Sequence, residues 1–323
     1  MTQINFAVIG VGSFGLKRAQ AIKENKMANL KAICDINKKN LQKAKDVLKV
    51  PSLEFKECLK NDDIDVICIC IPNKFHKQAI IDSLEAGKNV FCEKPLARNI
   101  LEAQEISKIV QKTKKKLQIG SNHRFFESVM FAKKLLDSGE LGKVLSFNGR
   151  IGHDGERIKE GWFMNRDLSG GGTLLDNGCH LLDLARYFVG DFNSGSGMVS
   201  NNYWKNIDVE DTAYGLFKNS KGQSCSIFCS WRLHSGYLFI ELNCKNGFIV
   251  IDGRFNTFET DKIFWSLNPG KLEIKDFSDI KPNSYKLEIE NFIKNLKQNK
   301  KLSPDIIDGL EVMKMIDLVY KKQ

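Results

Sequence analysis

The sequence lacks any closely spaced pair of cysteines of the kind that binds zinc. Its nine cysteines include no Cys-x-x-Cys motif and form an odd number, so neither a zinc site nor a disulfide framework is indicated. Several of them, such as Cys68 and Cys70, lie within apolar runs. We therefore expect buried, reduced thiols that pack as small hydrophobic side chains, and no metal site.

Long hydrophobic runs, internal repeats and low-complexity segments are also missing. No apolar stretch approaches the roughly 20 residues that a membrane span needs. The first five residues contain no basic region of the kind that begins a signal peptide. These features predict a cytoplasmic protein without a membrane partner.

Arginine is scarce in a chain with a net charge of +10. Only 9 of the 49 basic residues are arginine, although arginine is the side chain preferred for bidentate recognition of phosphates and bases. The lysines are dispersed, with Lys112 and 114–116 as the densest group. We therefore expect a solvated lysine-rich surface and no nucleic-acid partner.

The chain is long enough, and contains enough apolar residues, to form two domains. It has 323 residues, 42% of them hydrophobic, which is ordinary globular composition. The first ~120 residues alternate strand-like and helix-like segments, and the run at residues 66–71 is continuously apolar. This pattern predicts an α/β fold with a doubly wound parallel sheet over residues 1–121.

The second half of the chain has a different pattern. After a predicted helix over 174–189, strand-like segments follow one another to about residue 267, and two further helices are expected over 284–299 and after 303–305. Ser303 is the expected N-cap of the last helix, with Pro304 at its first position. Residues 122–323 are thus predicted to form a second α/β domain with a large, open, mostly antiparallel sheet, whose last helix packs back on the first domain.

A glycine-rich motif joins the first strand to the first helix. Gly10-Val11-Gly12-Ser13-Phe14-Gly15 has the form G-x-G-x-x-G, and its place between strand and helix is the context in which the motif binds a dinucleotide. Asp35 follows 20 residues later, at the end of the second strand, where a carboxylate accepts hydrogen bonds from the ribose hydroxyls. We therefore predict NAD as the cofactor, with NADP as an option because Lys38 and Lys39 lie nearby.

A second segment on the cofactor side follows the apolar run. Ile71, Pro72 and Asn73 come directly after that strand, at the carboxyl edge of the sheet, where ligands bind in folds of this type. His76 lies just behind them. It either contributes to the cofactor site or caps and packs on its own helix.

Three ionisable side chains offer acid–base chemistry. Lys94, in Glu93-Lys94-Pro95, ends the next strand and can stabilise a charged substrate oxygen. Asp176 and His180 are spaced i, i+4, hence on one helix face, and histidine is the most common general base near neutral pH. The triple glycine at 170–172 precedes this helix, and we expect it to be a flexible entry.

These motifs together resemble the Gfo/Idh/MocA oxidoreductase family. The resemblance rests on residues 10–15, Asp35, 71–73, 93–95, 122–125 and 170–183, and it extends along essentially the whole chain. It implies a Rossmann domain followed by an α/β domain, whose open sheet forms the interface of a homodimer or homotetramer. It also implies sugars, polyols or nucleotide-sugars as substrates.

The resemblance assigns roles to individual residues. It implies Lys94 as the substrate-contacting lysine, His180 as acid/base, and Asp176 as its partner or a substrate ligand. The cofactor residues that we predict from the motifs and the resemblance are Gly10, Gly12, Ser13, Phe14, Gly15, Asp35, Ile71, Pro72, Asn73, His76, Glu93, Lys94 and Asn122.

Substrate contacts are expected from the loop before the triple glycine and from arginines. Trp162 either stacks on a nicotinamide or sugar ring or pins its own loop. Arg124, Arg157 and Arg166 are candidates for an anionic substrate group. Asp183 continues the helix face of Asp176 and His180 and completes the predicted substrate set.

The resulting hypothesis is an NAD-dependent dehydrogenase acting on a secondary alcohol of a sugar, polyol or nucleotide-sugar. One alternative is an NAD-dependent glycosidase that oxidises its substrate transiently. Another is an NAD-responsive regulator that uses the same fold without catalysis.

Overall fold

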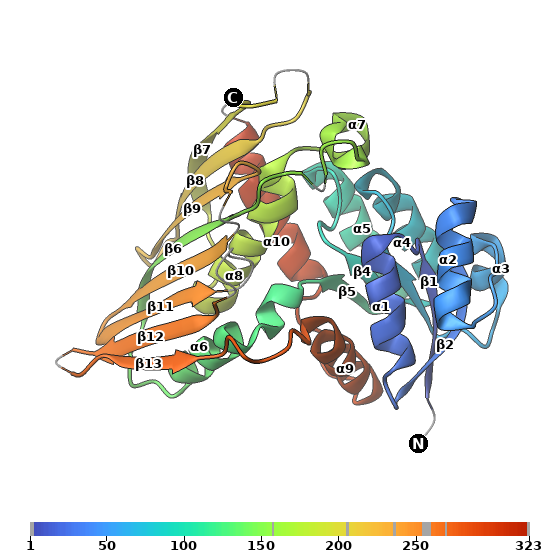
Figure 1. The fold of residues 1–323 in the computed structure, drawn as a ribbon, viewed down its shortest axis with the longest axis horizontal. Coiled ribbons are helices and arrows are strands. Elements are labelled where there is room, and N and C mark those ends of the chain that lie inside the picture. Colours follow the sequence, from blue (N-terminus) through green and yellow to red (C-terminus); the bar gives the residue numbers. More distant parts are fainter. Residues whose placement is uncertain are drawn as a thin grey trace. The chain divides into compact units, whose positions relative to one another are not determined.

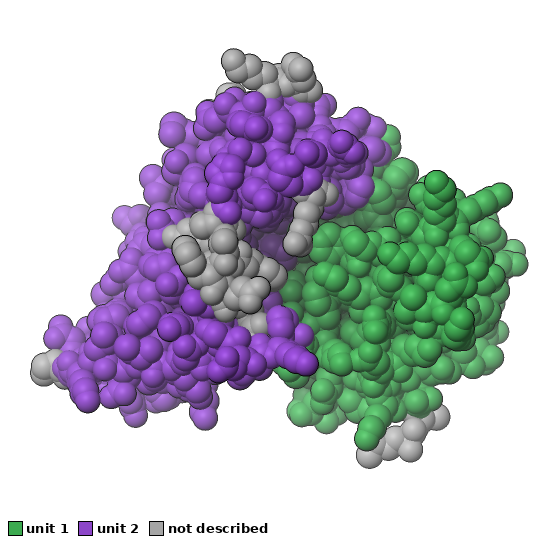
Figure 2. All heavy atoms as spheres, viewed as in Figure 1, with its two compact units in different colours: residues 1–122, 283–310 green, residues 123–282, 311–323 purple. Residues whose placement is uncertain are grey.

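A computed structural model describes residues 3–156, 158–204, 207–234, 237–253, 260–268 and 270–321. The chain forms two compact units, which Figure 2 shows in different colours. Unit 1 comprises Met1–Asn122 and Asn283–Leu310, and unit 2 comprises His123–Pro282 and Glu311–Gln323. No helix in the described part of the chain has the length and hydropathy needed to cross a membrane.

Unit 1 contains a five-stranded parallel sheet in the order β2-β1-β3-β4-β5 (Figure 1). Its central strand, β3, is fully apolar and buried, as expected where helices cover both faces. The strands are β1 (Ile4–Ile9), β2 (Ala28–Cys34), β3 (Val66–Ile69), β4 (Asn89–Glu93) and β5 (Leu117–Gly120). The helices between them are α1 (Ser13–Lys23), α2 (Lys38–Leu48), α3 (Phe55–Lys60), α4 (His76–Glu85) and α5 (Ile100–Thr113). The predicted doubly wound sheet is confirmed.

A helix from the far end of the sequence belongs to unit 1. In α9 (Ser284–Lys297), Ile289, Phe292 and Ile293 are buried in the same hydrophobic cluster as strand β1. The ring of Phe292 makes edge contacts with Phe6 and Phe91, at centroid distances of 6.0 and 5.5 Å. The core of unit 1 is therefore completed by residues about 170 positions after its last strand.

Unit 2 contains an eight-stranded sheet in the order β13-β12-β11-β10-β6-β9-β8-β7. Its strands are β6 (Val144–Gly152), β7 (Ser194–Ser200), β8 (Thr212–Lys218), β9 (Ser224–Ser230), β10 (Tyr237–Cys244), β11 (Gly247–Gly253), β12 (Lys262–Leu267) and β13 (Glu273–Asp276). All neighbours pair antiparallel except β6 and β9, which are parallel. The predicted, mostly antiparallel sheet is thus confirmed, and the parallel pair is an addition to it.

One face of this sheet is covered by helices α6 (Glu127–Asp137) and α8 (Cys179–Val189), which pack against β11 and β6. The strand residues that point to this face, such as Phe147 and Ile227, are buried. The other face carries exposed apolar side chains, among them Met198, Tyr214 and Leu216. The sheet is therefore open on one side within the described chain.

The last helix begins differently from the prediction. Helix α10 (Ile306–Tyr320) is capped by Asp305, whose carboxylate accepts hydrogen bonds from the backbone N–H groups of Ile307 and Asp308. Ser303 is consequently not the N-cap.

The expectation for the cysteines is confirmed: all nine are free, and all except Cys70 are buried.

Candidate active site

The glycine-rich loop of unit 1 uses its three glycines for different reasons. Gly10 adopts a φ of +85°, and a Cβ there would lie 2.4 Å from the carbonyl oxygen of Cys70. A Cβ on Gly15 would lie 1.9 Å from the carbonyl oxygen of Gly10. At Gly12, by contrast, a Cβ would meet no atom closer than 3.9 Å. Gly10 and Gly15 therefore allow the turn to form, and Gly12 leaves open space beside the backbone.

The surroundings of this loop suit a dinucleotide. Gly12 is the N-cap of α1, whose first N–H groups and positive dipole end favour an anion. Ser13 and Phe14, the predicted cofactor residues in its first turn, are both exposed. Asp35 accepts hydrogen bonds from the N–H groups of Val11 and Asn37, both at 2.8 Å. These bonds leave its carboxylate with unused acceptor capacity, because an ionised carboxylate offers about four lone-pair sites.

His76 lies behind the loop that carries Ile71, Pro72 and Asn73. Its Nε2 is 2.8 Å from the carbonyl oxygen of Ile71, and its Nδ1 is 2.9 Å from that of Pro95. Burial lowers the pKa of this imidazole, although the two carbonyl oxygens favour its protonation. Of the two predicted roles, the contacts favour the structural one: His76 joins the Ile71 loop to the segment that carries Lys94.

Lys94 follows a buried charge cluster. Glu93, directly before it, forms an ion pair with Arg18, and the same guanidinium pairs with Glu288 of α9. Arg18 is completely buried and lies over the rings of Phe91 and Tyr285. Burial raises the pKa of Glu288 to about 7, although Arg18 opposes that rise. The end of β4 is therefore fixed from inside unit 1.

Asn122 is the last residue of the first of the two segments that form unit 1. Its Nδ2 donates a hydrogen bond to the hydroxyl of Ser284 at 3.1 Å, and both residues are buried. The contact links the end of β5 to the start of α9. The predicted role of Asn122 in cofactor binding stays a prediction.

Asp176 lies on a π-helical turn, Leu174–Gly178, that leads directly into α8. The i, i+4 spacing of Asp176 and His180 therefore runs from a π turn into the first turn of an α-helix, where the sequence predicted one regular helix. One carboxylate oxygen of Asp176 accepts a hydrogen bond from Trp231 Nε1 at 3.1 Å and lies 3.9 Å from His153 Nε2. Neither of these neighbours was expected from the sequence.

His180 lies in the first turn of α8 and is buried, with 7% of its surface exposed. Its ring stacks on that of His123, with centroids 3.7 Å apart and planes inclined by 20°. Three residues further along the same helix, Asp183 binds Arg124 through two hydrogen bonds of 2.6 and 2.7 Å. Arg124 and Asp183, both predicted substrate contacts, thus bind each other, which favours a structural role for the pair.

The triple glycine is densely packed, which corrects the expectation of a flexible entry. A Cβ on Gly171 would lie 2.2 Å from the hydroxyl of Tyr320, and one on Gly172 would lie 1.9 Å from the carbonyl oxygen of Glu210. The Glu210 carboxylate accepts hydrogen bonds from the N–H groups of Gly172 and Leu174 and from Tyr320. Burial raises the pKa of Glu210, although these bonds oppose the rise. The turn before Asp176 is therefore held in place.

The remaining predicted substrate residues precede the triple glycine in the sequence. Trp162 is half-buried, and its ring stacks on that of Phe163 with the centroids 3.9 Å apart. Arg166 donates to the backbone oxygen of Asp208 at 2.7 Å. Arg157 lies outside the described residues. A stacking role of Trp162 on substrate stays a prediction.

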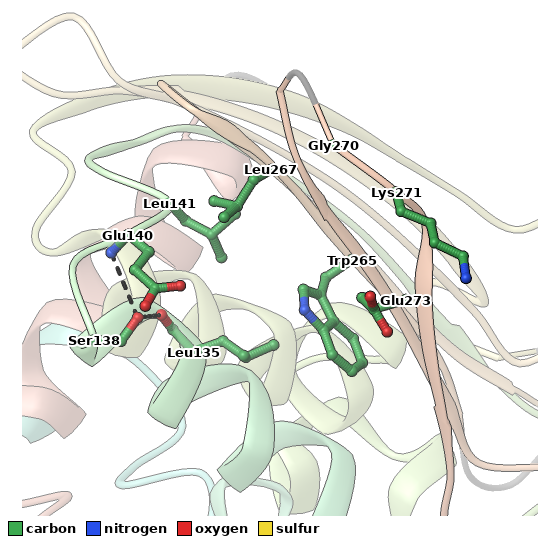
Figure 3. A pocket seen from close by; sticks show the side chains of 9 residues that line it. All are labelled: Leu135, Ser138, Glu140, Leu141, Trp265, Leu267, Gly270, Lys271 and Glu273. Carbon is green, nitrogen blue, oxygen red and sulfur yellow. Dashed lines mark hydrogen bonds between the residues drawn. The ribbon is translucent and has the colours of Figure 1, made fainter.

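A small pocket elsewhere in unit 2 contains none of the predicted site residues (Figure 3). Its volume is about 210 Å³. It lies beside the C-terminal end of α6 and strands β12 and β13 and is lined by Leu135, Ser138, Glu140, Leu141, Trp265, Leu267, Gly270, Lys271 and Glu273.

Comparison with known protein families agrees with the architecture of both units. Residues 4–121 match the model of an oxidoreductase family with an NAD-binding Rossmann fold, and residues 129–250 match the C-terminal domain of the same family. The chain belongs to the Gfo/Idh/MocA oxidoreductase family. NAD is accordingly its cofactor, and the glycine loop and Asp35 described above fit that group.

Individual family members are similar along most of the chain. Myo-inositol 2-dehydrogenase of Thermotoga maritima is 29% identical, over 95% of this chain and 91% of its own. Levoglucosan dehydrogenase of Pseudarthrobacter phenanthrenivorans is 23% identical, over 83% and 80%. A solved structure of a levoglucosan dehydrogenase with NADH and levoglucosan has a TM-score of 0.90 at 22% identity, covering 99% of this chain and 97% of that one. It shares the fold.

Four further residues lie beside the predicted site, and the sequence analysis of this family member assigned them no role. His123, His153, Glu210 and Trp231 lie against or beside the segment 170–183. Their partners are distant in the sequence, so no local spacing indicates them. Two of them lie in segments that the sequence indicated: His123 in the match of residues 122–125 to the family pattern, and His153 in the predicted substrate loop before the triple glycine.

Proposed function

We propose that the protein is an NAD-dependent dehydrogenase that oxidises a secondary alcohol of a sugar, a polyol or a nucleotide-sugar. The observation that carries this proposal is the buried imidazole of His180, in the first turn of α8, in a chain that also carries Lys94 at the end of a strand of an NAD-binding unit. The names of relatives that act on levoglucosan and on inositols support the substrate class.

The chain's own residues supply the proton chemistry. His180 takes the hydroxyl proton of the substrate as a general base, and the Lys94 ammonium hydrogen-bonds the same oxygen and stabilises its developing negative charge. Asp176, held by Trp231, orients the substrate or His180. When bound, NAD supplies the acceptor for the hydrogen and electron pair that leave the carbinol carbon.

The loop and the aspartate of unit 1 hold the cofactor. Gly12 allows the pyrophosphate to approach the backbone at the start of α1, and Asp35 accepts hydrogen bonds from the adenosine ribose. A carboxylate at this position repels a 2′-phosphate, so NAD is bound in preference to NADP.

A panel of sugars, polyols and nucleotide-sugars, followed by NADH absorbance with each cofactor, tests the proposal. Lys94→Ala and His180→Ala are each expected to lose at least about 10²-fold in turnover, while the NAD dissociation constant stays near that of the wild type. Lys77→Ala is the matched control, because Lys77 forms an exposed ion pair with Glu105. Unchanged turnover in both site variants would exclude these roles.

A second candidate keeps the cofactor but yields no net NADH. One relative, from Mediterraneibacter gnavus, is named 2,7-anhydro-N-acetylneuraminate hydratase and is 29% identical over 62% of this chain and 54% of its own. Conversion of a substrate with NAD required but no NADH accumulating would favour this candidate over a dehydrogenase.

We also propose that the open face of the eight-stranded sheet mediates homo-oligomer formation. Met198, Tyr214 and Leu216 expose 65%, 47% and 63% of their surfaces on neighbouring strands β7 and β8. Apolar patches of this kind are typical of association surfaces. Leu216→Glu is expected to lower the mass of the particle in light scattering to that of a smaller assembly, and an unchanged mass would exclude this face.

A further inference from the structure

We propose that His123 is a positioning residue for His180: its imidazole holds the His180 ring by stacking and opposes the protonation of that ring. The two rings are 3.7 Å apart and nearly parallel, and both residues are more than nine-tenths buried. The inference rests on the proposed role of His180 as general base. It adds a residue to which no role in the reaction was assigned above.

The position of His123 is set by its neighbours in the same short segment. The 3-10 helix η2 (Asn122–Phe125) carries both His123 and Arg124, and Arg124 binds Asp183 of α8 through two hydrogen bonds. The guanidinium of Arg124 also lies 4.8 Å from the ring of Tyr187, on the same helix. This clamp fixes η2 on α8, one turn away from His180.

A second ring also lies against His123. The phenyl ring of Phe126 has its centroid 4.5 Å from that of the imidazole, with the planes inclined by 35°. Close contact with two rings restricts the tilt of the His123 imidazole. The ring of His180, which stacks on this imidazole, is restricted in its tilt as a consequence.

Two stacked imidazoles titrate as a pair. A neutral imidazole can stack on a protonated one without repulsion between charges. Two protonated imidazoles at this separation repel each other strongly in a buried site. Protonation of either ring therefore opposes protonation of the other, and the pair takes up its protons in two separate steps. A base must be unprotonated to act, so this coupling extends the active form of His180 to lower pH.

The elements that carry the two rings also carry other charged groups. On η2, Arg124 is paired with Asp183 of α8. The π turn before α8 carries Asp176, which accepts a hydrogen bond from Trp231. Tyr187 adds no charge near neutral pH, because burial raises the pKa of its hydroxyl. A substitution at His123 removes the repulsion between the two rings and leaves these other groups in the protein.

The test replaces His123 with phenylalanine, which keeps the stack, and with alanine, which removes it. The His180 ring is followed by carbon NMR of histidine-labelled protein, and its signal is assigned by its absence in His180→Ala. In His123→Phe the midpoint of the His180 titration is expected to rise by about half a pH unit or more. The acid limb of the kcat–pH profile is expected to move in the same direction.

The alanine variant tests the positioning itself. His123→Ala is expected to lose about tenfold or more in kcat with an unchanged NAD dissociation constant, and His123→Phe to recover most of that loss. Equal His180 midpoints in wild type and His123→Phe, or a kcat of His123→Ala equal to that of the wild type, would overturn the proposal. NAD binding and thermal unfolding of both variants serve as folding controls.

The NMR readout separates this inference from the proposed function. A shifted His180 midpoint without any shift in the kcat–pH profile would support the coupled pair and overturn the role of His180 as the general base. A shift in neither would overturn the coupling, whatever the outcome of the Lys94→Ala and His180→Ala experiments.

Discussion

Two glycine-rich segments, residues 10–15 of unit 1 and 170–172 of unit 2, look alike in the sequence but are packed in opposite ways. In unit 1, a Cβ on the middle glycine of the motif, Gly12, would meet open space. In unit 2, the space beside Gly171 and Gly172 is filled by Tyr320 and by the backbone of Glu210. The first segment leaves open space that a ligand can occupy, and the second lets neighbouring parts of the protein pack closely against it.

The difference shows what glycine contributes in each unit. At Gly12 the missing side chain keeps the helix N-terminus accessible, which is a binding property. At Gly172 it allows two backbone segments to touch, which is a packing property and fixes the turn that leads to Asp176 and His180. Substitutions in the two glycine segments and at Glu210 test this distinction.

Gly172→Ala is expected to have the largest effect. A Cβ at this position would lie 1.9 Å from the carbonyl oxygen of Glu210. Either the turn at residues 170–174 or the backbone at Glu210 must therefore move. We expect a loss on the order of 3–5 kcal/mol in the free energy of unfolding, as for severe overpacking. Chemical denaturation measures it, and a loss below about 1 kcal/mol would contradict the packing role.

Gly171→Ala is expected to cost less, about 1–3 kcal/mol, because the obstacle is a side chain, the hydroxyl of Tyr320 at 2.2 Å. The clash depends on Tyr320, so the cost should shrink in a Tyr320→Leu background. A double-mutant cycle measures this coupling. Additive effects of the two substitutions would show that Tyr320 is not the obstacle.

Glu210→Gln is expected to change the pH dependence of stability. Burial raises the pKa of Glu210 in the folded protein, so the folded state binds a proton more readily than the unfolded state. The wild type therefore loses stability as the pH rises from the unfolded pKa of about 4.3 through the raised folded pKa. Glu210→Gln lacks this loss, and its stability relative to wild type should increase with pH; a difference independent of pH would contradict the assignment.

Gly12→Ala is expected to leave the free energy of unfolding within about 0.5 kcal/mol of the wild type. Its Cβ would meet no atom closer than 3.9 Å, and the backbone there is extended. The NAD dissociation constant, measured by titration calorimetry, should rise at least about tenfold because the methyl group occupies the approach of the pyrophosphate. Unchanged NAD binding would show that the open space has no ligand role.

The fold was largely predictable because its signals are local. The apolar run at 66–71 and the glycine motif at 10–15 each determine structure within a few residues, and both were interpreted correctly. The parallel pairing of β6 with β9 was not predicted, since it depends on which distant strands meet. The π turn at Leu174–Gly178 was missed as well, because an apolar periodicity does not distinguish it from an α-helix.

The site was predictable only in part for the same reason. Motifs marked Lys94, Asp176 and His180, but the contacts that hold them come from elsewhere: Arg18 and Glu288 behind Glu93, and His123 on His180. Glycine was ambiguous, since the sequence at 170–172 suits a flexible hinge as well as a close approach. The positions of Tyr320 and of the Glu210 backbone, both distant in the sequence, decide between them.

The central claim, oxidation of a substrate carbon with NAD as acceptor, is tested most directly by an isotope experiment. A sugar or polyol that is turned over is prepared with deuterium at its carbinol carbons and incubated with NAD, and the NADH formed is isolated for mass spectrometry. The account predicts one deuterium in each NADH, with the label lost together with turnover in His180→Ala. NADH without deuterium, or a product that regains its deuterium while no NADH accumulates, would contradict it.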